Sequence, residues 1–132
     1  MKVDQNEGRL MEHFKILIVD DDARNIFALK AVLQSKGYTC IAAGSGPEAL
    51  KAINTDPDIC IVLLDMMMPD MDGYEALRVI RSDKEISAAT VFAVTAQAMM
   101  GDREKCLEAG ANEYVSKPID VDLLLELLNR YK

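Results

Sequence analysis

Two kinds of hydrophobic pattern alternate along the chain. Short runs rich in β-branched residues predict strands, and the segments between them, where apolar residues recur every three or four positions, predict helices. The chain therefore repeats a strand followed by a helix, without a long linker between repeats. The predicted strands cover residues 15–19, 38–42, 59–64, 91–94 and 114–116.

Capping signals mark where the predicted helices begin and end. Gly37 follows the first helix at the position where a left-handed backbone often ends a helix. Ser45 and Glu48 have the spacing of a capping box and predict the start of the second helix. A fourth helix is predicted from about Met100 to Glu108. The last helix has the clearest spacing, with apolar side chains at Leu124, Leu127, Leu128 and Tyr131.

The apolar character of the strands predicts how the sheet is built. Residues 16–19 and 59–64 are continuously apolar, which is typical of a parallel sheet covered on both faces. Right-handed connections then place helices on both sides, so the fold class is α/β, with a three-layer sandwich. Residues 1–14 are predicted to be a flexible polar tail or linker, and residues 15–132 a single domain.

Composition narrows the class of protein. The chain has 132 residues, 15 of them basic and 22 acidic, for a net charge of −7, which argues against nucleic-acid binding. No apolar run is long enough to span a membrane, and no signal peptide precedes the first strand, so we expect a cytoplasmic protein. Cys40, Cys60 and Cys106 are predicted to be small buried side chains, and His13 a bystander in the tail.

Polar residues follow the predicted strands where each strand ends. Asp20, Asp21 and Asp22 follow the first strand, Asp65 the third and Thr95 the fourth, and Lys117 follows the fifth. Taken singly, Asp22 is equally well explained as a helix N-cap, Thr95 as a turn residue and Lys117 as solvated surface. Because parallel strands end at one edge of a sheet, where ligands bind in such folds, we expect these side chains to converge.

Converging carboxylates need a positive partner. Two carboxylates about 5 Å apart repel by roughly 3 kcal/mol at an effective dielectric constant near 20. Mg²⁺ prefers oxygen ligands of this kind and is usually bound together with phosphate oxygens. Lys117 and Thr95 suit the remaining oxygens of a phosphoryl group, and a carboxylate between them can act as the nucleophile. The residues therefore predict a magnesium-dependent phosphoryl-acceptor site.

Four stretches in order resemble the signature blocks of the receiver domain of two-component response regulators. They are ILIVDDD at 16–22, LDMMMPDMDG at 64–73, VTA at 94–96 and SKP at 116–118. The resemblance runs from about residue 15 to the C-terminus. It implies a flavodoxin-like (βα)5 fold with strand order 2-1-3-4-5 and a cis peptide bond between Lys117 and Pro118.

The resemblance also assigns roles at the acidic edge. Asp65 would accept the phosphoryl group from a phosphohistidine on a histidine kinase or a histidine phosphotransfer protein. Asp21 would bind Mg²⁺ directly, Asp20 largely through water, and the main-chain carbonyl of Met67 would be a further ligand beside Asp65. These four residues form the expected metal site.

Three further residues would respond to the phosphoryl group. Thr95 and Lys117 would each bind one of its oxygens, and Tyr114 would be the aromatic switch that changes rotamer when Thr95 is drawn inward. The protein would then be a signalling switch rather than an enzyme, either a monomer or a weak dimer that forms on phosphorylation.

Other interpretations stay open at this stage. A flavodoxin-like electron carrier would need a phosphate-binding loop and aromatics around a flavin, whereas this chain has three aspartates in that loop. An aspartyl phosphohydrolase would need an acid where Met67 stands. Within the receiver interpretation, the chain is either a stand-alone regulator or part of a hybrid histidine kinase, where it could serve as a phosphate relay or sink. Packing explains Met66 and Met68 as well as a docking surface does, and Met99 and Met100 are left open.

Overall fold

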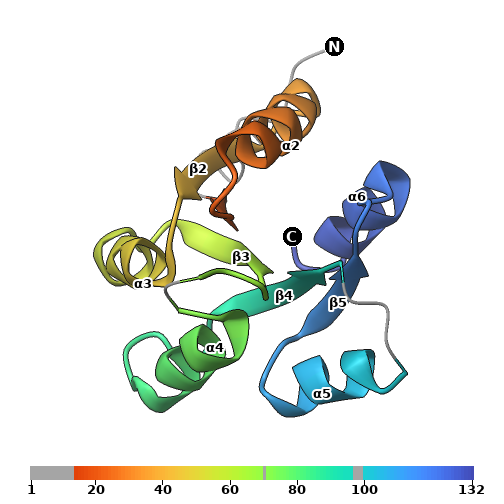
Figure 1. Cartoon of the computed structure of the whole chain (residues 1–132). Coiled ribbons are helices and arrows are strands. Elements are labelled where there is room, and N and C mark those ends of the chain that lie inside the picture. Colours follow the sequence, from red (N-terminus) through yellow and green to blue (C-terminus); the bar gives the residue numbers. More distant parts are fainter. Residues whose placement is uncertain (1–13, 70, 97–99) are drawn as a thin grey trace.

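The computed structural model describes residues 14–69, 71–96 and 100–132. Within these residues five strands alternate with five helices (Figure 1). The strands are β1 (Lys15–Val19), β2 (Thr39–Ala43), β3 (Ile59–Asp65), β4 (Thr90–Thr95) and β5 (Glu113–Ser116). The helices are α2 (Ala23–Ser35), α3 (Gly46–Thr55), α4 (Gly73–Ser82), α5 (Asp102–Glu108) and α6 (Val121–Asn129).

The strands form one parallel sheet in the order β2-β1-β3-β4-β5. Order and direction confirm the predicted fold class and the order that the family resemblance implied. Strand β1 lies between β2 and β3, so the chain reverses its direction of travel across the sheet at the carboxyl ends of β1 and β3. This reversal is where the acidic residues of the sequence are found.

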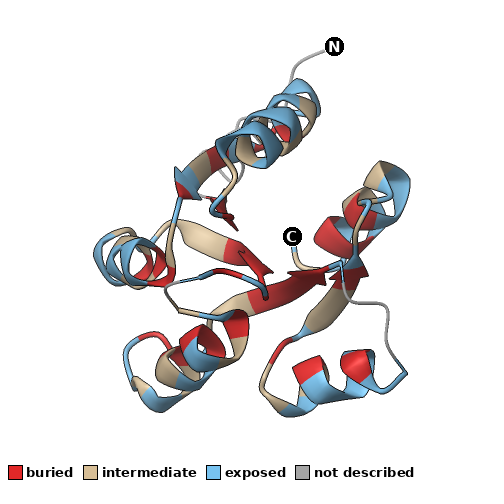
Figure 2. Cartoon of the chain, in the orientation of Figure 1, coloured by how far each residue is buried: buried red, intermediate tan, exposed pale blue. Residues whose placement is uncertain are grey.

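Helices cover both faces of the sheet (Figure 1). Helices α2 and α6 pack on one face with a core that includes Ile16, Leu33 and Leu128. Helices α3, α4 and α5 cover the other with a core that includes Leu64 and Leu77. Figure 2 shows that the buried residues concentrate on the central strands and on the sides of the helices that face them. The alternation of the two cores along each strand explains why the strands read as continuously apolar.

Side-chain caps fix the starts of the helices. Asp22 caps α2, since its carboxylate accepts a hydrogen bond from the Arg24 amide at 2.9 Å. Ser45 caps α3 by accepting from the Glu48 amide at 3.3 Å. The Glu48 carboxylate then accepts from the Gly44 amide at 2.7 Å rather than from that of Ser45, one residue earlier than a regular capping box.

The predicted boundaries need small corrections. Helix α5 begins at Asp102, not at Met100, because Gly101 adopts a left-handed backbone with φ of 88° and Met100 lies in the preceding turn. Cys60 is half-buried, whereas Cys40 and Cys106 are buried as predicted. His13 and Met99 lie outside the described residues.

The amino ends of the strands are held together by one arginine. Arg81, near the end of α4, donates hydrogen bonds to the carbonyl oxygens of Ser87, Ala89 and Gly110 and to Oδ1 of Asn112. These oxygens precede β4 and β5, and the donated distances run from 2.6 to 3.0 Å. We call this group the Arg81 clasp.

An ion pair joins the start of β1 to the turn before β3 at the same edge of the sheet. The ammonium of Lys15, at the start of β1, lies 2.9 Å from Oδ2 of Asp56, in the turn before β3. Just before Lys15, Phe14 is buried with its ring centroid 6.3 Å from that of Tyr38. Phe14 therefore belongs to the packed core.

Candidate functional site

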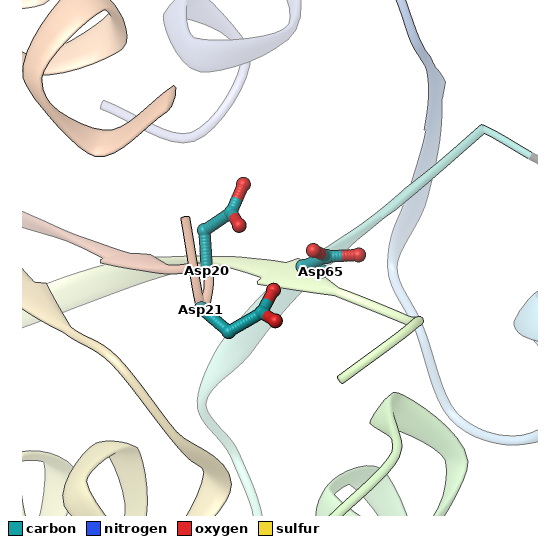
Figure 3. A group of neighbouring side chains, drawn as sticks. All are labelled: Asp20, Asp21 and Asp65. Atoms are coloured by element: carbon teal, nitrogen blue, oxygen red, sulfur yellow. The ribbon is translucent and has the colours of Figure 1, made fainter. Parts of the chain in front are cut away.

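Three carboxylates meet at the carboxyl edge of the sheet. Asp20 and Asp21 directly follow β1, and Asp65 is the last residue of β3. One oxygen from each lies within 4.8 Å of the others. Figure 3 shows the three side chains together at this edge of the sheet. Asp20 and Asp65 are each only 6% exposed, whereas Asp21 is exposed. The convergence predicted from strand ends is therefore present.

The start of α2 fixes the position of Asp20. Its Oδ1 accepts from the Asp22 amide at 2.9 Å, and its Oδ2 from the Asn25 side-chain amide at 3.3 Å. Asp22 itself points its carboxylate at Arg24 as the helix cap. Of the three consecutive aspartates, two therefore face the site and one belongs to the helix.

The loop after β3 fixes the position of Asp65. Its Oδ1 accepts from the Met67 amide at 3.0 Å, while Met66 and Met68 are buried in the core. The packing interpretation of those two methionines thus holds. The loop lies directly on the start of α4, where a Cβ at Gly73 would come within 2.6 Å of the Met66 Cα. Only glycine permits this close approach, so Gly73 helps to set where Asp65 stands.

Lys117 brings a positive charge to the two buried acids. Its Nζ lies 3.3 Å from Oδ2 of Asp20 and 3.4 Å from Oδ2 of Asp65. Lys117 follows β5, and the peptide bond to Pro118 is cis, as the family resemblance implied. One cation thus lies between carboxylates from two different strands.

The charges of the site shift the proton affinity of its groups. Burial raises the pKa of the Asp65 carboxyl, and the negative charge of Asp20 adds to this, while the Met67 amide and Lys117 oppose it without cancelling it. Burial lowers the pKa of the Lys117 ammonium, but the attraction of Asp65 and Asp20 outweighs burial, so its pKa is raised. The site therefore carries surplus negative charge that favours binding of a cation.

Thr95 and Tyr114 lie on the face of the sheet that α3, α4 and α5 cover. Thr95 ends β4, next to β3 and Asp65, and is 2% exposed. Tyr114 pairs with Ala93, two residues before Thr95, so both side chains point to the same face. A cavity of about 470 Å³ reaches Thr95 from the outside, between Met66 on the β3–α4 loop and Lys105 on α5.

The donor set fits a hard divalent cation. Three carboxylates of one small cluster offer oxygen atoms, and the outward position of Asp21 leaves room for water and for a phosphate oxygen. Asp65 also has the half-buried ammonium of Lys117 beside it and the buried hydroxyl of Thr95 on the next strand. Met67, the position of the acid that a phosphohydrolase would need, is 52% exposed and carries a thioether. The arrangement can accept a phosphoryl group but offers no general acid at that position.

Comparison with known proteins shows the family. The sequence profile of the response regulator receiver domain matches residues 16–129. The chain belongs to the receiver domain family. This match covers all four stretches from which the resemblance was first inferred, and the receivers of this family act in two-component signalling.

Relatives of similar length support the assignment. The polar-differentiation response regulator DivK of Brucella ovis is 35% identical over 117 residues, which is 88% of this chain and 94% of that protein. DivK of Brucella anthropi is 34% identical over the same share of each chain.

Solved structures give the same result. A response regulator receiver protein from Pseudomonas putida has a TM-score of 0.82 at 28% identity, covering 88% of this chain and 95% of that one. The receiver domain of sensor histidine kinase PA1611 from Pseudomonas aeruginosa has a TM-score of 0.80 at 35% identity, covering 89% and 95%. That structure has a magnesium ion coordinated in its active-site cleft.

Sequence reasoning missed two polar residues, one that contacts Asp20 and one that contacts Tyr114. Asn25 reads as an ordinary first-turn residue of a helix, although it donates to Asp20. Asp102 reads as a favourable charge at a helix start, although it accepts from two tyrosine hydroxyls. Asn25 could have been found from its position one turn after the aspartates, whereas nothing local marks Asp102. No helix among the described residues is long and apolar enough to cross a membrane.

Proposed function

We propose that the protein is a phosphorylation switch in which Asp65 accepts a phosphoryl group from a phosphohistidine. The observation that carries this proposal is the convergence of three carboxylates and Lys117, whose ammonium lies 3.3 Å from Asp20 and 3.4 Å from Asp65. The donor is the phosphohistidine of a histidine kinase or of a histidine phosphotransfer protein. Beyond its own phosphorylation and dephosphorylation, the protein catalyses no reaction.

The transfer conserves atoms and charge in one displacement. A carboxylate oxygen of Asp65 forms a bond to phosphorus as the phosphorus–nitrogen bond of the donor breaks. The electron pair returns to the imidazole nitrogen, and the ring, protonated at its other nitrogen, leaves as neutral histidine. Lys117 balances charge on the phosphoryl oxygens, and the Thr95 hydroxyl donates to another of them.

Mg²⁺ is the cation that the site is expected to hold. Asp21 would bind it directly, Asp20 through water, and Asp65 and the Met67 carbonyl would complete the protein ligands. Bound there, the ion neutralises charge on the acids and on the phosphoryl group in the transfer. The magnesium coordinated in the related PA1611 receiver supports this choice of metal.

The donor must approach over α2 and the segment after β5. An apolar cavity of about 310 Å³ lies between these elements, and both Asp65 and Lys117 form part of its wall. Ala28 of α2 lines this cavity, whereas Ala31, also exposed on α2, does not. A histidine that reaches Asp65 from this side brings its flanking residues into contact with the cavity. We expect the transfer to take place in the cytoplasm. The protein itself would be a monomer, or a weak dimer that forms on phosphorylation.

The acceptor can be tested with a small phosphodonor. Incubation with Mg²⁺ and acetyl phosphate should add the mass of one phosphoryl group, located on Asp65 by peptide mass spectrometry after borohydride reduction. Asp65→Asn should abolish the addition, while Asp22→Asn, which removes an equal charge from the helix cap, should retain it. Equal labelling of Asp65→Asn and the unmodified protein would rule out this acceptor.

The proposed docking surface on α2 can be tested with two matched variants. Ala28→Asp should slow transfer from a phosphorylated histidine phosphotransfer protein about tenfold or more, since it places a charge in the apolar cavity. Ala31→Asp adds the same charge to the same helix and should leave that rate unchanged. Both variants should react normally with acetyl phosphate, which needs no docking surface. Equal rates for the two variants with the protein donor would place the docking surface elsewhere.

A further inference from the structure

A third buried carboxylate lies outside the phosphoryl-acceptor site. Asp102, in the first turn of α5, is only 8% exposed. The Tyr114 hydroxyl donates to its Oδ2 at 2.8 Å, and the Tyr74 hydroxyl to its Oδ1 at 3.3 Å. Cys106 lies 3.5 Å from the Tyr74 hydroxyl. We call Tyr74, Asp102, Cys106 and Tyr114 the tyrosine–aspartate cluster.

The cluster joins side chains from three elements that share one face of the sheet. Tyr74 comes from the first turn of α4, Asp102 from α5 and Tyr114 from β5. The Lys105 ammonium lies 4.7 Å from the centre of the Tyr74 ring, and no ion pair of Asp102 occurs among the described residues. The two phenols are therefore the groups seen to compensate the buried charge of Asp102. Charge-assisted hydrogen bonds of this kind are about twice as strong as neutral ones.

The hydrogen bond between Tyr114 and Asp102 can affect the position of the Tyr114 ring. Tyr114 and Thr95 point to the same face of the sheet, and Tyr74 and Thr95 line the same cavity. A movement of the Tyr114 ring toward space vacated by Thr95 requires its hydroxyl to leave Asp102. The free energy of that bond thus enters directly into the equilibrium between the two ring positions.

We propose that Asp102 is a positioning residue that holds Tyr114 against α5 and so sets how readily the switch turns. The inference rests on the proposed function, because it concerns the response to a phosphoryl group on Asp65. Burial and the hydrogen bond that its hydroxyl donates to Asp102 raise the pKa of Tyr114 to about 12, in keeping with a phenol that donates to a carboxylate. Burial, followed by Cys106 and Asp102, raises the pKa of Tyr74 as well.

The test uses a phosphoryl mimic and a matched pair of acids. The protein is titrated with beryllofluoride in the presence of Mg²⁺, and the amide NMR signals of Ser116 and Lys117 report the switch. Asp102→Asn replaces a charge-assisted bond by a weaker neutral one and should lower the half-saturating beryllofluoride concentration about fivefold to tenfold. Glu104→Gln removes the same charge from the same turn of α5, at an exposed position, and should leave the titration unchanged.

A double mutant separates positioning from general loosening of the fold. If Asp102 acts through the Tyr114 hydroxyl, Asp102→Asn should have no further effect in a Tyr114→Phe background. The proposal is overturned if Asp102→Asn has the same effect with Tyr114 present as with Tyr114→Phe. It is also overturned if Asp102→Asn has no effect when Tyr114 is present. Should Asp102→Asn not fold, as judged by circular dichroism, Tyr74→Phe tests the same cluster. Removing the Tyr74 hydroxyl leaves Asp102 more dependent on the Tyr114 phenol, so this variant should raise the half-saturating concentration by a smaller factor, and an unchanged or lowered concentration overturns the proposal.

Labelling keeps this inference distinct from the proposed function. Acetyl phosphate should phosphorylate Asp65 in the unmodified protein and in every variant of the cluster. Absence of labelling in the unmodified protein would refute the proposed function itself. Full labelling with identical titrations would refute only the role of Asp102.

Discussion

At the amino ends of the strands Arg81 donates all five of its N–H groups to protein oxygens, whereas at the carboxyl ends two buried carboxylates share Lys117. Among the described residues Asp21 has no cation partner at all. The amino edge is therefore satisfied by the protein itself. The carboxyl edge retains surplus charge that a bound cation and a phosphoryl group can use.

The largest loss of stability should come from removing the Arg81 hydrogen bonds at the amino edge. Arg81→Met removes the donors to four oxygen atoms, three of which are main-chain carbonyl oxygens in partly buried contacts, so we expect the free energy of unfolding to fall by about 3 kcal/mol. Denaturant unfolding measures the change. Arg78→Met, on an exposed face of the same helix, should have little effect. A comparable loss in both variants would mean that the Arg81 clasp is not what holds this edge.

A smaller effect is expected when the surplus charge of the other edge is neutralised. Mg²⁺ at ten times its dissociation constant should stabilise the protein by about 1.4 kcal/mol, because it binds only the folded state. Asp21→Ala should abolish this stabilisation in a thermal melt. Asp22→Ala should lower the melting temperature by removing the α2 cap but retain the response to Mg²⁺. Retention of the response in Asp21→Ala would show that the metal binds elsewhere.

The cost of burying the Asp65 charge, to which repulsion by Asp20 adds, should be visible in the pH dependence of stability without metal. Since the folded-state pKa of Asp65 is raised above 3.8, the folded state binds this proton more tightly than the unfolded chain does. Its contribution to stability is full below pH 3.8 and is lost as the pH rises through the raised pKa.

Asp65→Asn should therefore match the unmodified protein near pH 3 and exceed it at pH 7 by roughly 1 kcal/mol, about 3–6 °C in melting temperature. Thermal melts across this range measure the difference. Glu85→Gln, an exposed acid outside the site, should show no such growing difference. An advantage of Asp65→Asn that does not change with pH would argue against the buried charge of Asp65 as its cause.

The smallest effect should follow loss of the ion pair at the amino edge. Lys15 and Asp56 lie 2.9 Å apart, but both are partly exposed to solvent, which screens their attraction. Lys15→Met should leave the melting temperature unchanged within error, at both low and high salt. A clear loss of stability at low salt would show that the amino edge depends on charge as well as on the Arg81 clasp.

Most of the fold followed from patterns that are local in sequence. The continuous apolar strands and the caps at Asp22 and Ser45 depend on residues that are neighbours in the chain. The start of α5 was wrong because the apolar Met100 extends the helical pattern, whereas the left-handed Gly101 separates it from the helix.

The candidate site was predictable in part for a related reason. Strand ends converge in any parallel sheet, so Asp20, Asp65 and Lys117 could be brought together from sequence. Arg81 and Asp102 could not, because their partners lie 6 to 31 residues away and their own surroundings read as ordinary helix termini. Their roles depend on tertiary contacts that have no local signature. The functions assigned to Thr95, Tyr114 and Met67 remain predictions.

The parallel sheet predicts how the effects of substitutions vary along the sequence. Because every strand runs in the same direction, each strand-to-helix loop lies at the carboxyl edge and each helix-to-strand loop at the amino edge. A saturation mutagenesis scan with separate measures of cellular abundance and of signalling should therefore show an alternating pattern. Substitutions in the loop holding Asp20 should impair signalling and spare abundance, while those in the turn holding Ala89 should deplete the protein. Loops in which substitutions impair signalling would therefore alternate along the sequence with loops in which substitutions lower abundance, once in each strand–helix repeat.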